Sequence, residues 1–299
     1  MAPRTSLLAL DGRVDTADLA RGSVLFVGTA TTVIRYGGFT LLTDPNFLHA
    51  GDHAHLGYGL TSRRLTDPAI EPEDLPPLDA CILSHLHGDH WDRVAEASLS
   101  RDLPILTTPH AARRLRGRGF GEARGLSRWD AVVLERGRAW LKVTAMPGRH
   151  AFGLAGALLP PVMGSMLEFG VGETTALRTY ISGDTLFHED LAEIPRRYPE
   201  VDLGLFHLGG TRVLGLLVTM DARQGIAAIR LVRPRVAIPV HYDDYPVFRS
   251  PLSEFRSAVA GADLDTEVRY LARGERYEFQ VFPHAEAVED AGASPGAPA

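Results

Sequence analysis

One short segment concentrates side chains that bind metal ions. Within Ser84–His90 stand four such side chains: His85, His87, Asp89 and His90. In an extended segment residues i and i+2 share a face, so the first two histidines can converge on one ion. A turn at Gly88 would let the aspartate and the last histidine face a second ion. Imidazole nitrogen and carboxylate oxygen are ligands of zinc, and also of iron or manganese.

The position of this segment favours a metal site over a histidine-rich surface loop. It follows directly on the apolar stretch 80–84, which has the length and composition of a short buried strand. Three further segments each end a predicted strand with a metal-binding side chain: Pro147-Gly148-Arg149-His150, Ser182-Gly183-Asp184-Thr185 and Pro239-Val240-His241-Tyr242. We therefore expect several strand ends to meet at one site.

Short strand signals outnumber helix signals between residues 23 and 282. We expect strands over 23–28, 32–36, 39–43, 80–84, 105–108, 131–134, 140–145, 163–169, 176–181, 201–206, 236–240, 268–271 and 277–282, with Gly37-Gly38 as a hairpin turn. We expect helices over 92–99, 109–116, 189–197, 222–231 and 251–259. Many strands with helices between them indicate two packed sheets with helices outside.

The domain organisation expected from the pattern is simple. Residues 1–22 are expected to be a lead-in with a short helix near 15–20, residues 23–282 a single domain, and residues 283–299 a disordered tail. The stretch from Pro45 to Pro77 is too long for an ordinary connection and is expected to be irregular, as in lids and binding loops. Its side chains His49, His53, His55 and Tyr58 are candidates for substrate contact or for plain solvated loop residues.

Composition excludes several classes of protein. The chain has 299 residues, a net charge of −6 and one cysteine, Cys81, so an intrachain disulfide is excluded. No apolar run approaches the ~18 residues of a membrane span, and the apolar run 7–10 is too short for a signal-peptide core. We expect a cytoplasmic protein, since a single cysteine fits a reducing compartment. The negative net charge disfavours nucleic acid as a partner.

The motifs resemble the metallo-β-lactamase superfamily, whose signature is His-x-His-x-Asp-His. The later histidine, aspartate and histidine segments follow in the family's order. The resemblance implies a four-layer αββα sandwich with the site at one edge of the two sheets. It implies two divalent ions, with zinc favoured and manganese or iron as alternatives. His85, His87 and His150 would hold one ion; Asp89, His90 and His241 would hold the other; Asp184 would bridge them.

Further segments resemble one branch, which contains L-ascorbate 6-phosphate lactonase and N-acyl-phosphatidylethanolamine phospholipase D. The segments 26–31, 41–45 and 239–255 carry this resemblance. The chain departs from the branch at three places: Thr29 stands where a histidine is frequent, the segment 150–154 lacks an arginine, and Val218-Thr219-Met220-Asp221-Ala222 replaces His-x-Asp-Pro. These departures leave the substrate of the branch open for this chain.

The expected activity is metal-dependent hydrolysis. A hydroxide bridging two metal ions would attack a small ester, lactone or phosphodiester, which makes the protein a phosphodiesterase or a lactonase/esterase. Asp89 would orient the hydroxide. His207 ends the strand expected over 201–206 and would be a proton donor or substrate contact, with a structural role as the alternative. Asp44 would support a metal ligand from behind or form a plain turn.

Two other functions remain open from the sequence. Residues 101–149 carry eleven basic and four acidic side chains, a net of +7, which motivates a metal-dependent nuclease. The departures from the branch motivate a non-catalytic metal-binding module. The segment Leu154–Val162 is almost wholly apolar and favours a partly apolar small-molecule substrate. It would equally suit contact with a second copy of the chain or with a membrane surface.

Overall fold

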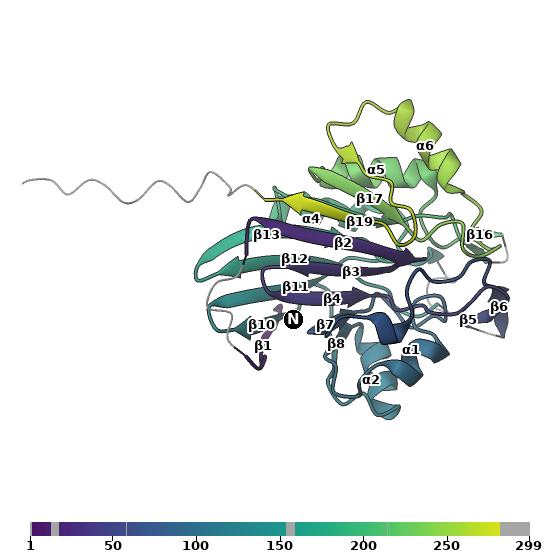
Figure 1. Cartoon of the computed structure of the whole chain (residues 1–299). Coiled ribbons are helices and arrows are strands. Elements are labelled where there is room, and N and C mark those ends of the chain that lie inside the picture. The colour runs from purple at the N-terminus through teal and green to yellow at the C-terminus, as the bar shows by residue number, and fades with distance from the viewer. Residues whose placement is uncertain (1, 13–17, 58, 154–158, 214, 282–299) are drawn as a thin grey trace, which may run out of the picture.

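The strands alternate between two buried faces. Val24 and Phe26 belong to one apolar cluster, whereas Leu25 and Val27, on the opposite face of the same strand, belong to another. A strand that is apolar on both faces needs cover on both sides. The computed structural model, which describes residues 2–12, 18–57, 59–153, 159–213 and 215–281, provides that cover with two facing sheets and outer helices (Figure 1).

The first sheet has seven strands in the order β19-β2-β3-β4-β7-β8-β9. Strands β2, β3 and β4 form an antiparallel meander, and β4, β7, β8 and β9 are parallel. Their bounds are β2 (Arg21–Gly28), β3 (Thr31–Tyr36), β4 (Phe39–Thr43), β7 (Ala80–Ile82), β8 (Ile105–Thr107), β9 (Ala123–Gly125) and β19 (Arg276–Gln280).

The second sheet has eight strands in the order β1-β10-β11-β12-β13-β14-β17-β18. Strands β10 to β13 are an antiparallel meander, and β13, β14, β17 and β18 are parallel. The bounds are β1 (Thr5–Ala9), β10 (Ala131–Arg136), β11 (Ala139–Met146), β12 (Gly164–Val171), β13 (Thr174–Ile181), β14 (Leu203–His207), β17 (Val236–Val240) and β18 (Glu267–Val268).

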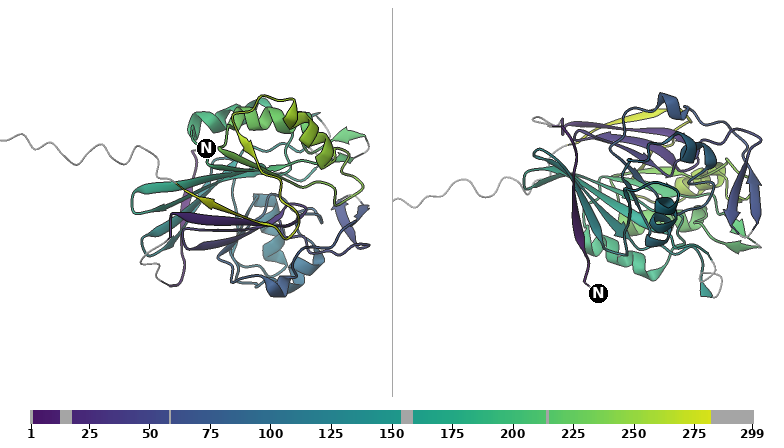
Figure 2. Two further views of the ribbon diagram at one scale, coloured as in Figure 1. Left: turned by 45° about the horizontal axis from the view of Figure 1, so that its top comes forward. Right: turned by 90° about the horizontal axis from the view of Figure 1, so that it is seen from below.

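Helices cover the outer face of each sheet, which gives the αββα sandwich that the resemblance implied (Figure 2). Helices α1 (Arg93–Ser98) and α2 (Pro109–Gly117) share an apolar cluster with the seven-stranded sheet. Helices α4 (Glu193–Arg197), α5 (Ala222–Val232) and α6 (Leu252–Ala260) share one with the eight-stranded sheet. The side chains of Asp92, Thr108 and Asp221 cap the amino termini of α1, α2 and α5.

The stretch from Pro45 to Pro77 is more ordered than the sequence indicated. It contains a hairpin of β5 (His53–Gly57) and β6 (Leu60–Arg63), followed by the 3₁₀ turn η1 (Pro72–Asp74). Ala54 and Leu56 pack against Tyr245 and Phe248 in a small cluster of their own. The expectation of an irregular stretch was therefore wrong. The apolar partners that stabilise this hairpin come from residues about 190 positions further along the chain, so the local sequence does not reveal them.

Other predictions differ at the ends of the chain. Residues 5–9 form β1 and pair with β10, so the segment expected as a lead-in contributes an edge strand to the second sheet. The short helix expected near 15–20 falls partly outside the described residues, and its described part, 18–20, is not helical. The tail 283–299 lies outside the described residues. The strands β9, β15 (Arg212–Val213) and β16 (Leu216–Leu217) were not expected, and the helix expected over 189–197 consists of the 3₁₀ turn η2 (Glu189–Ala192) followed by α4.

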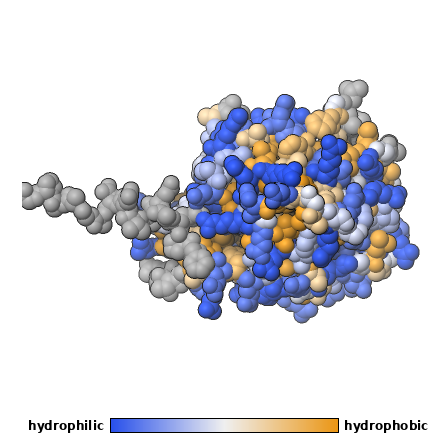
Figure 3. All heavy atoms as spheres, turned by 90° about the horizontal axis from the view of Figure 1, so that it is seen from above, coloured by the Kyte–Doolittle hydropathy of each residue, from blue (hydrophilic) through white to orange (hydrophobic). Residues whose placement is uncertain are grey.

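Within the described part of the chain, no helix is long and apolar enough to cross a membrane. The face seen from above in Figure 3, on the side of α5 and α6 in Figure 1, shows polar residues with smaller apolar areas between them.

Candidate metal centre

The predicted ligands all follow the carboxyl ends of strands at one edge of the sandwich. The motif 85–90 follows β7, and His150 follows β11. Asp184 follows β13, and His241 follows β17 directly. β13, β14 and β17 are parallel, and β11 runs in the same direction, two antiparallel steps from β13. The strand directions therefore carry these side chains to the same edge.

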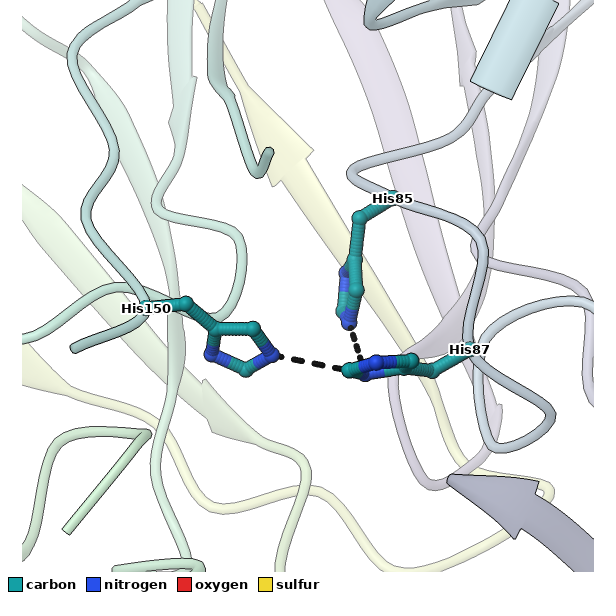
Figure 4. Close-up of side chains that lie close together, drawn as sticks. All are labelled: His85, His87 and His150. Atoms are coloured by element: carbon teal, nitrogen blue, oxygen red, sulfur yellow. Dashed lines mark hydrogen bonds between the residues drawn. The ribbon is translucent and has the colours of Figure 1, made fainter. Parts of the chain in front are cut away.

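Three histidines form a first group, which we call the histidine group: His85, His87 and His150 (Figure 4). His87 Nδ1 lies 2.9 Å from His85 Nε2 and 3.3 Å from His150 Nε2. Such short distances bring three imidazole nitrogens to one point. The three side chains come from two different sheets, so the point lies between the sheets at their edge.

Four other side chains form a second group, the carboxylate group: Asp89, His90, Asp184 and His241. His90 Nε2 lies 3.3 Å from Asp184 Oδ2 and 3.8 Å from Asp89 Oδ2. His241 Nε2 lies 3.4 Å from Asp89 Oδ2. All four residues are buried. The ring centroids of His85 and His90 are 4.2 Å apart, so the two groups are adjacent.

The rings of the histidine group remain neutral near pH 7. Burial and the neighbouring His150 lower the pKa of His87 to about 4. Burial, with His90 and His87 nearby, holds the pKa of His85 well below its ordinary value. Burial also lowers the pKa of His150. Each ring therefore keeps a lone pair available for a cation.

The carboxylate group has the opposite electrostatics. Burial alone would lower the pKa of His90, but the facing carboxylates of Asp184 and Asp89 raise it well above its ordinary value. For His241, burial again lowers the pKa, but the nearby carboxylates, Asp184 above all, outweigh burial and raise it above its ordinary value. Burial alone would raise the pKa of Asp184, but His241 and His90 hold it well below the ordinary value. Two ionised carboxylates thus stand in a buried site, where their charge must be compensated.

Hydrogen bonds to main-chain carbonyls fix the outward nitrogens of two ligand rings. His150 Nδ1 lies 2.7 Å from the carbonyl oxygen of Val218, and His241 Nδ1 lies 3.0 Å from that of Leu208. A carbonyl only accepts, so each Nδ1 carries a proton and each Nε2 is the nitrogen directed toward the other side chains of its group. Thr219 Oγ1 donates to Asp184 Oδ2 at 2.8 Å. In the sequence, residues 218 and 219 stand out only as a departure from the branch, because their hydrogen-bond partners are distant in the chain.

The donor set fits divalent metal ions. Three buried side-chain atoms of the carboxylate group lack a hydrogen-bond partner: Asp89 Oδ1, His90 Nε2 and Asp184 Oδ1. Buried polar atoms are almost always paired, so unpaired ones at a single place need an explanation. Imidazole and carboxylate ligands in this number are those of zinc and of similar divalent metals.

Gly88 is required for packing. It does not use the left-handed backbone, and an added Cβ would lie 2.5 Å from the backbone nitrogen of His55. Gly88 N donates to His55 O at 2.8 Å, and Asn46 Nδ2 donates to Gly88 O at 3.0 Å. The hairpin β5–β6 therefore lies directly on the ligand segment. The turn at residues 88–90 is present, but backbone freedom is not the reason for the glycine.

The backbone at the site is strained in two places. His241 has a φ of 63° and Asp44 a φ of 35°, both in the left-handed region that side chains with a Cβ avoid. Strain of this kind is found mainly at functional sites, where the surrounding structure enforces it. In His241 the strained turn follows β17 directly, and the ring faces the carboxylate group.

The two other strand-end residues lie behind the ligands. His207 Nε2 lies 3.1 Å from Asp44 Oδ2, and Asp44 Oδ1 lies 3.5 Å from His90 Nδ1. His207 is 1% exposed, and its Nδ1 lies 3.3 Å from Ser182 Oγ. Both nitrogens of His207 thus face protein groups, which favours a supporting role over the expected proton transfer or substrate contact. Asp44 contacts the rear nitrogen of His90, which agrees with the expectation that it supports a ligand from behind and not with that of a plain turn.

The loop histidines lie outside the two groups. The side chains of His49, His53 and His55 are exposed, and His49 lies 3.1 Å from Glu71. Tyr58 lies outside the described residues. Beside His150 there is a cavity of about 340 Å³ lined by Gly148–Gly153 and Pro160–Val162. Residues 154–158 of the predicted apolar loop lie outside the described residues.

A family model described as beta-lactamase superfamily domain matches residues 40–242, which span both ligand groups. The chain belongs to this family. Among the curated relatives of this chain is a UPF0173 metal-dependent hydrolase of Archaeoglobus fulgidus. It is 29% identical over 216 residues, covering 70% of this chain and 85% of the relative. A UPF0173 metal-dependent hydrolase of Deinococcus radiodurans is 29% identical over 229 residues, covering 73% and 92%.

Solved structures show the same metallo-β-lactamase fold. An isothiocyanate hydrolase from Delia radicum gut bacteria superimposes with a TM-score of 0.73 at 21% identity, covering 86% of this chain and 99% of that one. A possible metal-dependent hydrolase from Veillonella parvula superimposes with a TM-score of 0.72 at 21% identity, with the same coverage. At this identity the likeness extends to the fold alone. The branch named in the sequence analysis stays a prediction.

Proposed function

We propose that this protein is a metal-dependent hydrolase that uses two divalent cations, with zinc favoured over manganese or iron. His85, His87 and His150 would hold one cation. Asp89, His90 and His241 would hold the other, with Asp184 facing both. The observation that carries the proposal is the convergence of seven ligand side chains, six buried and His87 partly buried, from four strand ends into two adjacent groups. The names of the relatives agree with it.

Two bound cations supply an activated water near neutral pH and positive charge for the transition state. The chain's own groups prepare the site for this chemistry. Val218 O and Leu208 O hold the protons of His150 and His241 on the outward nitrogens. Thr219 Oγ1 restrains Asp184. Asp89 Oδ1 is buried without a hydrogen-bond partner, so it is free to orient the attacking water and accept its proton.

We propose a small ester, lactone or phosphodiester with an apolar part as the substrate class. The support is the cavity beside His150, whose lining includes Phe152, Pro160, Pro161 and Val162. Phe152 is 52% exposed, and Leu216 of the hairpin β15–β16, which leads into Val218, is 54% exposed. Apolar surface next to polar reacting groups is typical of small-molecule sites. The long polyanion of a nuclease substrate would gain little from it.

Metal analysis tests the central proposal. We expect close to two ions per chain in a fully loaded preparation, and we expect chelation to abolish hydrolysis with recovery on adding Zn²⁺ back. A His87→Ala variant purified in parallel is the control against a contaminating hydrolase. A loaded preparation that holds at most one ion contradicts the binuclear site. Two ions without activity on any substrate favour the non-catalytic module.

A substrate series tests the proposed class. Chromogenic phosphodiesters, phosphonates and lactones would be compared in pairs that differ only in the length of an apolar substituent. We expect the apolar member of each pair to have the higher kcat/KM, and Phe152→Ser to reduce that preference. Equal rates within the pairs, or a preference for RNA, would contradict the proposed substrate class.

A further inference from the structure

A hydrogen-bonded pair joins the two sheets next to the carboxylate group. Asp44 follows β4 of the seven-stranded sheet, and His207 ends β14 of the eight-stranded sheet. His207 Nε2 lies 3.1 Å from Asp44 Oδ2, and each side chain is 1% exposed. An interaction between sheets at this depth fixes the position of both side chains relative to the ligands.

The Asp44 carboxylate is connected to the ligand segment by its other oxygen. Oδ1 accepts hydrogen bonds from Ser84 N at 2.8 Å and Ser84 Oγ at 2.9 Å. The same oxygen lies 3.5 Å from His90 Nδ1. The opposite nitrogen, His90 Nε2, faces Asp184 at 3.3 Å. A carboxylate behind a ligand histidine keeps the proton on the rear nitrogen and sets the direction of the ring.

The ring of His207 is held in a fixed orientation. It lies nearly parallel to the ring of His90, with planes at 13° and centroids 5.9 Å apart. Its backbone N–H donates to Ser182 Oγ at 2.8 Å, and its Nδ1 lies 3.3 Å from the same oxygen. Nδ1 thus meets Ser182 of its own sheet, while Nε2 reaches across to Asp44. The two ring nitrogens have separable contacts.

We propose that His207 is a positioning residue for the second cation. Its Nε2–H holds the Asp44 carboxylate in the orientation that directs His90 Nε2 into the carboxylate group. The inference rests on the proposed function, because it concerns a cation bound by that group. It follows that loss of the Nε2 contact should weaken the second cation more than the first, which the histidine group would hold.

Two amide substitutions separate the contacts of His207. The amide of Gln places a donor near the position of Nε2, whereas the shorter Asn places one near Nδ1. We therefore expect His207→Gln to keep the contact with Asp44 and His207→Asn to lose it. If His207 acted only through its contact with Ser182, His207→Gln would weaken the second cation more than His207→Asn. A role limited to filling space predicts equal effects.

The experiment is a titration of metal-free protein with Zn²⁺ by calorimetry, repeated with Co²⁺ and followed by absorption. We expect wild type to bind two ions, His207→Asn to bind the second about 10- to 100-fold more weakly, and His207→Gln to stay within about threefold of wild type. His188→Asn is the matched control: His188 is buried, and both its ring nitrogens lack a hydrogen-bond partner. We expect no change of either affinity in that variant.

The outcomes separate this inference from the proposed function. A wild-type protein that binds fewer than two ions overturns the binuclear proposal and this inference together. Two ions in wild type with equal second affinities in the Asn and Gln variants overturn the inference alone. If His207→Asn fails to fold by circular dichroism, Asp44→Asn tests the same contact from the other partner. An unchanged second affinity there also overturns the inference.

Discussion

The histidine group and the carboxylate group are neighbours, yet the pKa values of their histidines shift in opposite directions. In the histidine group burial lowers every pKa, and the rings stay neutral. In the carboxylate group Asp184 and Asp89 raise the pKa of His90, and ionised carboxylates remain. The same degree of burial thus yields one neutral and one charged set of ligands. The difference indicates that partners, more than depth, decide the charge of a buried histidine.

The largest expected effect comes from removing Asp184, the carboxylate that we propose to face both cations. Asp184→Asn keeps the shape but removes the charge that faces His90 and His241, so we expect loss of one of the two ions. We expect kcat/KM to fall by more than about 100-fold, since even the loss of a supporting contact costs 10- to 100-fold. Metal analysis and steady-state kinetics on the same sample measure both. Two tightly bound ions in this variant would mean that the carboxylate is not a ligand.

Asp89→Asn sharpens the contrast between binding and turnover. The histidines of both groups remain, so we expect part of the second ion to be kept. The free Oδ1 that would accept a proton is lost, so we expect kcat to fall by about 100-fold with a smaller change in metal content. Single-turnover rates at saturating Zn²⁺ separate the two effects. Full recovery of the rate at high Zn²⁺ would leave Asp89 as a ligand only.

A smaller effect is expected from the support of Asp184. Thr219→Val is nearly isosteric and removes the 2.8 Å hydrogen bond to Asp184 Oδ2. We expect about a 10-fold lower affinity for the second ion. The matched control is Thr211→Val, since Thr211 is also buried and its Oγ1 has no hydrogen-bond partner. Similar losses in both variants would point to general loosening of the hairpin β15–β16.

The smallest effect concerns a buried histidine outside both groups. Burial and the nearby Arg149 lower the pKa of His188 from 6.5 to about 4. Between these two values the unfolded chain binds a proton that the folded chain does not, so folding stability falls as pH drops. We expect His188→Gln to lose less stability than wild type over this interval, with a difference in Tm of roughly 2 °C. Parallel losses in the two proteins would show that the histidine titrates alike in both states.

The sequence was most informative where chemistry and pattern coincide. The motif 85–90, the three later ligand segments and most strands of both sheets were predicted within a few residues, because a strand end followed by a metal-binding side chain is a local signal. The hairpin β5–β6 was missed because its core contains Tyr245 and Phe248, which are far away in sequence. Strand β1 was missed because it is short and mostly exposed at a sheet edge.

The sequence by itself determined which residue types are available for metal chemistry and in which order they follow the strands. The resemblance to the family had implied the same two groups, but only the tertiary structure decided how the side chains of each group are charged. Asp89 and His90 are adjacent to the histidine motif in sequence, but they face Asp184 and His241 in space. From the sequence, His207 was expected to be a proton donor or substrate contact, yet its Nε2 contacts Asp44, which lies behind His90. Charge and hydrogen bonding depend on distances across the sheets, and these distances are set by the packing of the whole sandwich.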